Sequence, residues 1–134
     1  MTSKIIYEGD LRTNATHLNS GNNINTDAPI DNNGKGECFS PTDLMASALG
    51  SCMLTIIGIY SKNNNINIKG AKAGITKIMA EEPRCIKQIE VMLDFTKLDI
   101  SKKAQKAFKK LAQNCPVALS LNKEINQVLR LKFD

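Results

Sequence analysis

The feature that most constrains this chain is a long uncharged stretch that follows a helix-start signal. The residues Ser40-Pro41-Thr42-Asp43 predict a helix start, because Ser is a good N-cap, Pro suits the first helical position and an acid at the third favours a capping box. From Leu44 to Tyr60 no residue is charged. We expect the helix to extend to about Lys62 and, because it has no polar face, to be covered on every side.

The uncharged stretch is close to the lower length limit for a membrane span. It is rich in Ser, Gly, Thr and Ala and stands alone in the chain, so we interpret it as the buried central helix of a globular protein. We therefore expect no membrane partner. Small residues such as Gly50 and Gly58 would let other elements approach its backbone closely.

The segment before the helix has the pattern of short strands. Residues 3–18 predict a hairpin that turns at Glu8-Gly9-Asp10, and a third short strand falls near residues 24–26. Residues 27–39 are polar and Gly-rich, which predicts a loop of a length that is usually functional.

The segment after the helix predicts two strands, two helices and a final strand. These are strands at 66–80 and 85–95, a helix capped by Ser101, a short helix at 116–121 and a strand at 124–133. The order βββ–α–ββ–α–α–β indicates an α+β fold. At 134 residues the chain is expected to form a single domain, residues 1–134.

The cysteines favour redox chemistry over a structural framework. The first residues lack the apolar segment of a secretory signal, which predicts a cytoplasmic protein whose four cysteines are not bonded in structural disulfides. No pair has the close spacing of a zinc site and His17 is the single histidine, so we expect no metal and no cofactor. The thiols can therefore be free and buried, or redox-active.

The net charge of +5 does not by itself indicate a nucleic-acid partner. The most basic segment is the helix over residues 102–110, and we interpret its lysines as a solvated face that is not confined to one stripe. No aromatic platform accompanies them, since aromatics make up 4% of the chain. We expect no nucleic-acid partner.

Cys52 and Cys115 are the candidate reactive thiols. Cys52 lies mid-helix, where a free cysteine usually acts as a small hydrophobe, and it is about 16 Å from the helix start, beyond the reach of the helix dipole. A thiolate there would need a cation from elsewhere, and Arg12, after the Gly9-Asp10 turn, is the candidate. Cys115 precedes Pro116 at a helix start, which favours a thiolate, with a buried thiol as the alternative.

Two motifs carry a resemblance to a known family. The stretch Phe39-Ser40-Pro41-Thr42-Asp43-Leu44-Met45-Ala46-Ser47-Ala48-Leu49-Gly50-Ser51-Cys52 and the later Asn114-Cys115-Pro116-Val117 resemble the OsmC/Ohr family, the osmotically inducible and organic hydroperoxide resistance proteins of bacteria. The Ser-Pro-Thr-Asp helix start is similar to the OsmC-like branch. The resemblance implies an intertwined homodimer in which two long central helices pack between curved sheets.

The resemblance also implies a thiol-dependent peroxidase. Cys52 would attack the peroxide and become a sulfenic acid, Cys115 would condense with it to a disulfide, and an external dithiol would reduce that disulfide. Arg12 falls where the family places its catalytic arginine. The glutamate that pairs with this arginine in the family is Thr42 here, so Glu37 or the adjacent Asp43 is the substitute to consider.

A different class of function remains open at this point. The chain could be a non-catalytic binding protein that holds a small hydrophobic ligand in the dimer groove. The sequence assigns no role to His17, Cys38 or Cys85.

Overall fold

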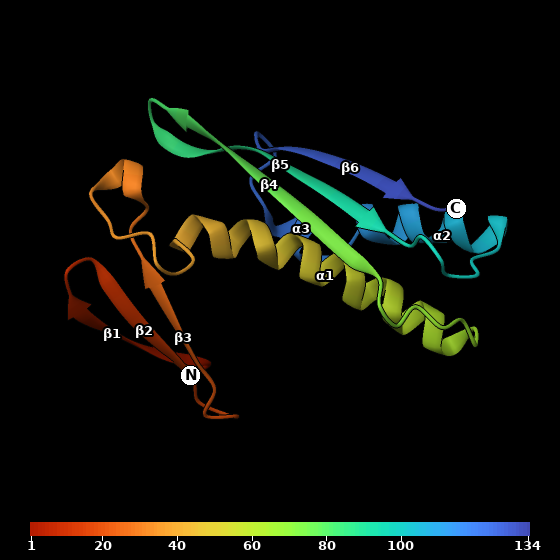
Figure 1. The fold of residues 1–134 in the computed structure, drawn as a ribbon, viewed down its shortest axis with the longest axis horizontal. Helices are drawn as coiled ribbons and strands as arrows, with labels where there is room; N and C mark the ends of the chain where they lie inside the picture. Colours follow the sequence, from red (N-terminus) through yellow and green to blue (C-terminus); the bar gives the residue numbers. More distant parts are fainter. The chain divides into compact units, whose positions relative to one another are not determined.

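The computed structural model describes all 134 residues, which divide into two compact units, Met1–Met45 and Ala46–Asp134. Helix α1 (Pro41–Asn63) begins in the first unit and continues in the second. In chain order the elements are three strands, the long helix, two strands, two shorter helices and a last strand, and Figure 1 labels them. The predicted α+β class and its βββ–α–ββ–α–α–β order are confirmed, and a single 3-10 turn at Ile30–Asn32 is added.

The N-terminal unit is an antiparallel sheet in the order β1-β2-β3, formed by Ser3–Gly9, Arg12–His17 and Asn23–Asp27. Between β1 and β2 the chain turns through Asp10 and Leu11, which both have positive φ, at 52° and 63°. Two left-handed residues match the twist of the flanking strands in a tight hairpin. The turn makes Arg12 the first residue of β2, directly opposite Asp27 at the end of β3.

The predicted polar loop begins later than expected. Asp27 is the last residue of β3 and is buried, so its assignment to the loop was wrong. Backbone hydrogen bonds fold the rest of the loop back on itself: the Asp27 N–H donates to the Phe39 carbonyl at 3.1 Å, and the Gly36 N–H donates to the Ala28 carbonyl at 3.3 Å. The loop is therefore tied to the end of the sheet.

The start of α1 is the capping box that the sequence predicts. The Asp43 N–H donates to Ser40 Oγ at 3.0 Å, and the Ser40 N–H donates to the Asp43 carboxylate at 3.0 Å. These two bonds satisfy backbone groups that a helix terminus otherwise leaves without partners.

The C-terminal unit has a mixed sheet in the order β4-β5-β6. Strands β4 (Lys72–Glu81) and β5 (Arg84–Asp94) are antiparallel, whereas β6 (Asn126–Lys132) is parallel to β5. The expected start of the first strand at residue 66 was wrong. Asn65 and Gly70 have positive φ, 55° and 94°, and turns at residues 64–65 and 69–70 precede the strand, with no strand assigned over 66–71.

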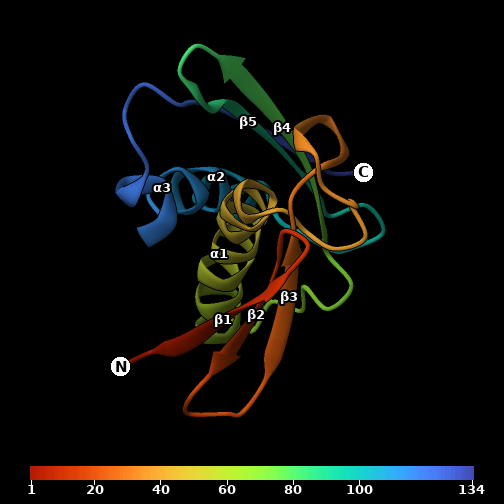
Figure 2. The same cartoon turned by 90° about the vertical axis from the view of Figure 1, so that its left-hand side faces the viewer.

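Two further helices complete this unit: α2 (Lys102–Gln113), capped by Ser101, and α3 (Pro116–Ser120). In Figure 2, α1 and α2 lie on the same side of β4 and β5. Between sheet and helices the core contains Phe95 and Phe108, whose ring centroids are 5.1 Å apart.

The lysines of α2 lie on one side of the helix. At 100° per residue they all fall within an arc of about 120°, so the expectation that they are not confined to one stripe was wrong.

Within one chain, α1 is buried on one side only. One face of α1 is buried, through residues such as Leu49, Met53 and Ile57, whereas Met45 and Ile59 on other faces are exposed. By length and composition α1 could also cross a membrane, a criterion that the core helix of a soluble protein meets as well. In the N-terminal unit the apolar side chains of Ile5 and Tyr7 are 63% and 64% exposed. The cover that the sequence predicts for this apolar surface is incomplete within one chain.

Candidate active site

Two thiols come together in the C-terminal unit. Cys52 lies in the middle of α1, and Cys115 is the N-cap residue of α3, directly after the end of α2. The two thiols are close enough that Cys52 affects the ionisation of Cys115, and neither cysteine is in a disulfide. Cys115 is fully buried and Cys52 is half-buried, so Cys52 is the thiol that a small molecule from solvent can reach first.

Burial governs the protonation of Cys115. It is the largest effect and raises the pKa of this thiol, and the neighbouring Cys52 adds to the increase. The backbone N–H groups of Ala118 and Val117 act in the opposite direction, but the Cys115 side chain makes no capping hydrogen bond. Of the two alternatives that the sequence left open, burial favours the neutral thiol over the thiolate.

In the N-terminal unit Arg12 forms a bidentate ion pair with Asp27. The Arg12 Nε–H donates to Oδ1 at 2.7 Å and Nη2–H donates to Oδ2 at 2.8 Å. Asp27 is 1% exposed and Arg12 is 29% exposed. The hydrogen bond from Arg12 is the largest of the effects that lower the pKa of Asp27 to about 2. This side-on pairing leaves the two N–H groups of Nη1 for another acceptor.

Glu37 is close to Arg12 but is not its main partner. Its Oε2 lies 3.7 Å from Arg12 Nη2, and its side chain is 62% exposed. Its backbone N–H instead donates to Asp27 Oδ2 at 3.1 Å. The other proposed substitute, Asp43, is engaged in the capping box, and the hydroxyl of Thr42 lies 3.3 Å from Ser40 Oγ.

Asp27 is the partner of Arg12 that the sequence analysis missed. The signal was available in the strand pattern: pairing the second and third strands across the turn at residues 18–22 brings Arg12 opposite Asp27. The residue was overlooked because it opens a polar segment. The Asp27 carboxylate accepts hydrogen bonds from Arg12 and from the Glu37 N–H, and the nearby Cys38 thiol also contributes to its lowered pKa.

A shallow cavity of about 560 Å³ lies beside Glu37 and Cys38, the neighbours of the Asp27 carboxylate. It lies within the N-terminal unit and is lined by Ile24, Asn25, Gly36, Glu37, Cys38, Phe39 and Asp43. Of the other candidates, His17 Nδ1 lies 2.6 Å from Ser20 Oγ at an exposed turn, and Cys85 is exposed on β5. No three His, Cys, Asp or Glu side chains gather where they could hold a metal ion.

Fold and site define a class: an α+β protein whose long central helix presents a half-buried thiol to a second, buried thiol at the start of a short helix. The chain belongs to the OsmC-like protein family, which matches residues 34–129. No curated protein sequence matches the chain.

Solved structures share the fold over the whole chain. An osmotic stress induced and detoxification response protein from Psychrobacter arcticus is 49% identical, with a TM-score of 0.95, and the match covers 98% of this chain and 96% of that one. The organic hydroperoxide resistance protein OsmC from Legionella pneumophila is 14% identical, with a TM-score of 0.72 over 98% and 97% of the two chains. OhrB of Bacillus subtilis is 19% identical, with a TM-score of 0.63 over 98% of each. The last two show the fold alone.

Proposed function

We propose that the protein is a cysteine-dependent peroxidase that reduces organic hydroperoxides or hydrogen peroxide. The observation that carries the proposal is the proximity of two free thiols, Cys52 in the middle of α1 and Cys115 at the start of α3. Membership of the OsmC family supports a general role in redox chemistry and peroxide resistance. The Legionella and Bacillus proteins with the same fold are described as organic hydroperoxide resistance proteins.

The proposed reaction has two steps on the protein. The Cys52 thiolate attacks one peroxide oxygen and the O–O bond breaks; Cys52 becomes a sulfenic acid, and the other oxygen leaves and takes a proton as alcohol or water. The Cys115 sulfur then attacks the sulfenic sulfur, forming the Cys52–Cys115 disulfide and releasing water. An external dithiol restores both thiols.

Arg12 is proposed to bind the reacting peroxide. A guanidinium keeps its charge at every relevant pH and presents N–H groups in a fixed plane, so its Nη1 donors can stabilise negative charge on a peroxide oxygen. In this proposal Asp27 replaces the family glutamate as the carboxylate that orients Arg12, because it accepts both the Nε and Nη2 hydrogen bonds. Glu37 then contributes mainly its backbone N–H.

The proposal includes a homodimer in the cytoplasm. The exposed apolar residues of α1 and of the N-terminal sheet favour a second copy of the chain, because a monomer would leave a large apolar surface in water. Light scattering at micromolar concentration tests this part, and a stable monomer would contradict it.

A single-turnover assay tests the chemistry. The reduced protein receives one equivalent of hydrogen peroxide or of an alkyl hydroperoxide, and thiols and peroxide are counted together. We expect the loss of two thiols per peroxide, with peptide mapping showing a Cys52–Cys115 linkage and reduced Cys38 and Cys85. Cys52→Ser abolishes consumption, whereas Cys115→Ser allows one turnover that stops at sulfenic acid.

Cys85→Ser is the matched control, because Cys85 is exposed and outside the thiol pair. It should leave both the rate and the stoichiometry unchanged. Unchanged thiols after peroxide exposure would contradict the peroxidase and favour the alternative, a protein that binds a small hydrophobic ligand without catalysis.

A further inference from the structure

Helix α2 carries a concentrated positive surface outside the thiol site. We define the lysine ridge as its five lysines, all of them exposed: Lys102, Lys103, Lys106, Lys109 and Lys110. They fall within about 120° of the helix circumference and span about 12 Å along its axis. The same arc includes Gln113 but no acidic, aromatic or other apolar residue.

The ridge is unfavourable for the isolated protein. Lys102 and Lys106, and Lys106 and Lys110, are like charges four residues apart on one helix face, which destabilises a helix. Lys102 and Lys103 also stand in the first turn, where the helix dipole opposes positive charge. No carboxylate lies within 4.0 Å of these amino groups. A negative surface brought from outside would relieve this repulsion.

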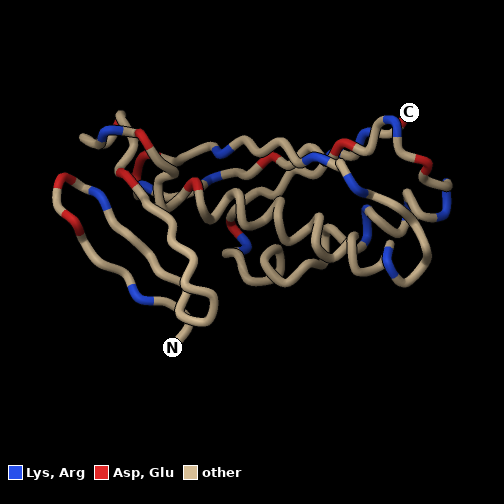
Figure 3. The backbone as a smooth tube through the Cα atoms, turned by 60° about the horizontal axis from the view of Figure 1, so that its bottom comes forward, with Lys and Arg blue, Asp and Glu red and all other residues tan.

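Charge is unevenly distributed along the chain. Residues 1–45 include three basic and six acidic residues, whereas residues 46–134 include fifteen basic and seven acidic residues. Figure 3 marks basic residues in blue and acidic residues in red along the backbone, and the α2 sequence includes five lysines and no acidic residue. The ridge is therefore the densest run of a single charge sign in the molecule.

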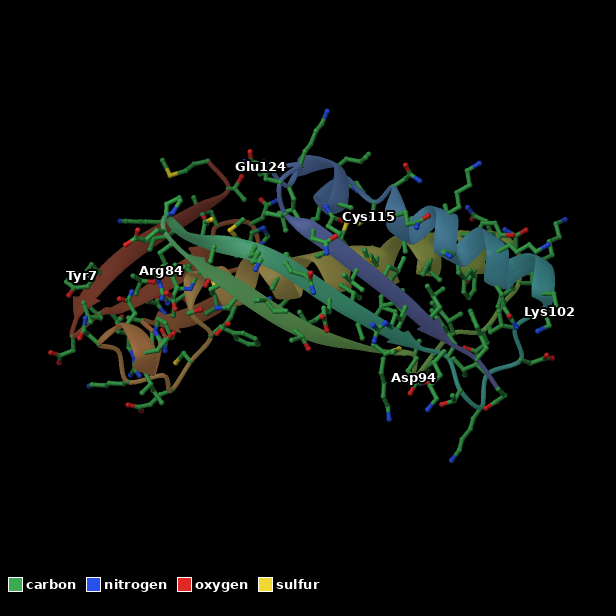
Figure 4. The ribbon with its side chains drawn as sticks, turned by 90° about the horizontal axis from the view of Figure 1, so that it is seen from above. Tyr7, Arg84, Asp94, Lys102, Cys115 and Glu124 are labelled. Atoms are coloured by element: carbon green, nitrogen blue, oxygen red, sulfur yellow. The ribbon has the colours of Figure 1, made fainter.

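The lysine ridge lies on the helix that directly precedes Cys115. Helix α2 ends at Gln113, Asn114 is its C-cap, and Cys115 follows directly. Figure 4 shows Lys102 at the far end of α2 and Cys115 beyond its other end. A partner that buries about 800 Å² of each surface covers a patch roughly 30 Å across, which is long enough to include both the ridge and the segment around Cys115.

We propose that the lysine ridge is the docking surface for an acidic protein whose dithiol reduces the Cys52–Cys115 disulfide, an inference that rests on the proposed function. Charge complementarity selects an acidic partner and speeds its association. A protein is favoured over a membrane because the arc has no apolar side chain to insert among lipids. It is favoured over a nucleic acid because the arc offers neither an aromatic ring nor an arginine for base contacts.

The docked partner reduces the disulfide by two successive thiol–disulfide exchanges. A partner thiolate attacks Cys52 Sγ, the more exposed of the two sulfurs, and the Cys52–Cys115 bond breaks. Cys115 leaves as a thiolate and takes a proton from water. The second partner thiol, deprotonated, attacks the mixed disulfide, so the partner ends as a disulfide and Cys52 as a thiol. Two electrons pass from the partner to this protein.

The test uses synthetic dithiol probes. Two peptides have the same pair of cysteines, one flanked by six glutamates and the other by six glutamines; dithiothreitol is the uncharged small-molecule control. Each reduces peroxide-oxidised protein under stopped flow. Lys106→Glu/Lys109→Glu is the ridge variant, and Lys69→Glu/Lys87→Glu is its control, with the same charge change on exposed residues elsewhere in the C-terminal unit.

At low ionic strength we expect the acidic peptide to reduce the wild type and the control variant about tenfold or more faster than the neutral peptide. The preference should disappear in the ridge variant and in about 0.5 M salt, where exposed charges are screened. Dithiothreitol should act equally on all three proteins. Equal rates for the two peptides on the wild type, or the same loss in the control variant, would overturn the docking proposal.

A binding measurement separates this inference from the proposed function. The acidic peptide, alkylated on both cysteines and fluorescently labelled, should bind reduced wild-type protein in an anisotropy titration and bind the ridge variant at least tenfold more weakly. If peroxide forms no disulfide, the peroxidase fails, and the titration still decides whether the ridge docks an acidic chain. Stronger binding of duplex DNA or phosphatidylserine vesicles than of the peptide would overturn the choice of partner.

Discussion

The close packing of α1 on β4 makes a sharp prediction at Gly50, two residues before Cys52. A methyl group at Gly50 would overlap Cδ1 of Ile75 and lie 3.4 Å from the Cβ of Ala73. The same methyl at Gly58 would meet only Ile68 Cδ1, at an ordinary contact distance of 3.9 Å. Gly50→Ala and Gly58→Ala are therefore the same chemical change on one helix with different steric outcomes.

The expected magnitudes follow from two opposing effects. Replacing Gly with Ala inside a helix stabilises it by about 1 kcal/mol, which Gly58→Ala should realise in full. Gly50→Ala gains the same amount but must displace Cδ1, the end of the Ile75 side chain, and this overpacking costs about 1 kcal/mol, the low end of the usual range, because a side-chain end can move. The free energy of unfolding of Gly50→Ala should thus be lower than that of Gly58→Ala by about 1 kcal/mol.

Urea unfolding followed by circular dichroism, at one fixed protein concentration, measures this difference. A double-mutant cycle with Ile75→Val tests the cause directly, because this substitution removes the overlapped Cδ1 atom. Alone, it should destabilise by about 0.5–1.5 kcal/mol, but together with Gly50→Ala the loss should be smaller than the sum. A Gly50→Ala protein as stable as Gly58→Ala, or a strictly additive double variant, would refute the packing argument.

Three further predictions concern Asp27, Glu37 and Ser61. An ordinary aspartate has a pKa of 3.8, and the pKa of Asp27 is about 2, so its ion pair stabilises the fold above about pH 4 and this stabilisation is lost as the pH falls toward 2. In Asp27→Asn the free energy of unfolding, followed by fluorescence, should therefore depend less on pH in that interval. In the peroxidase assay Asp27→Asn should slow peroxide reduction about tenfold or more, whereas Glu37→Ala should stay within about twofold; the reverse order would return the orienting role to Glu37. The hydroxyl of Ser61 is buried without a hydrogen-bond partner, so Ser61→Ala should raise the free energy of unfolding by about 1 kcal/mol, and a loss of stability on urea titration would show that the hydroxyl has a partner.

Local signals in the sequence predict much of this fold. The start of α1 is fixed by side chains within three residues of one another, Ser40 and Asp43, and the cap of α2 by Ser101 and the N–H of Ala104. Alternation and turn residues predict the hairpins in the same way. Such features depend on neighbours along the chain, which a sequence displays directly.

Features that depend on distant parts of the chain were less accessible. Asp27 is polar and follows a short strand, and only its cross-strand position opposite Arg12 shows that it is a buried ion-pair partner. The start of β4 was placed early because Ile66 and Ile68 continue the apolar alternation, although the left-handed residues around them end it. The contact between Cys52 and Cys115 was implied by resemblance alone, since nothing local relates two cysteines so far apart.

The parallel pairing of β5 and β6 has a consequence for how this protein is made. Parallel neighbours need a long crossover, and Cys115 lies on the crossover from Asp94 to Asn126. The crossover is closed only when β6, which follows Cys115 along the chain, pairs with β5. During synthesis the segment that holds the second thiol therefore stays open until β6 has also been made. A product that stops before β6 keeps all four cysteines but has no strand to close the crossover, so it should hold the thiol pair less firmly than the product that includes β6.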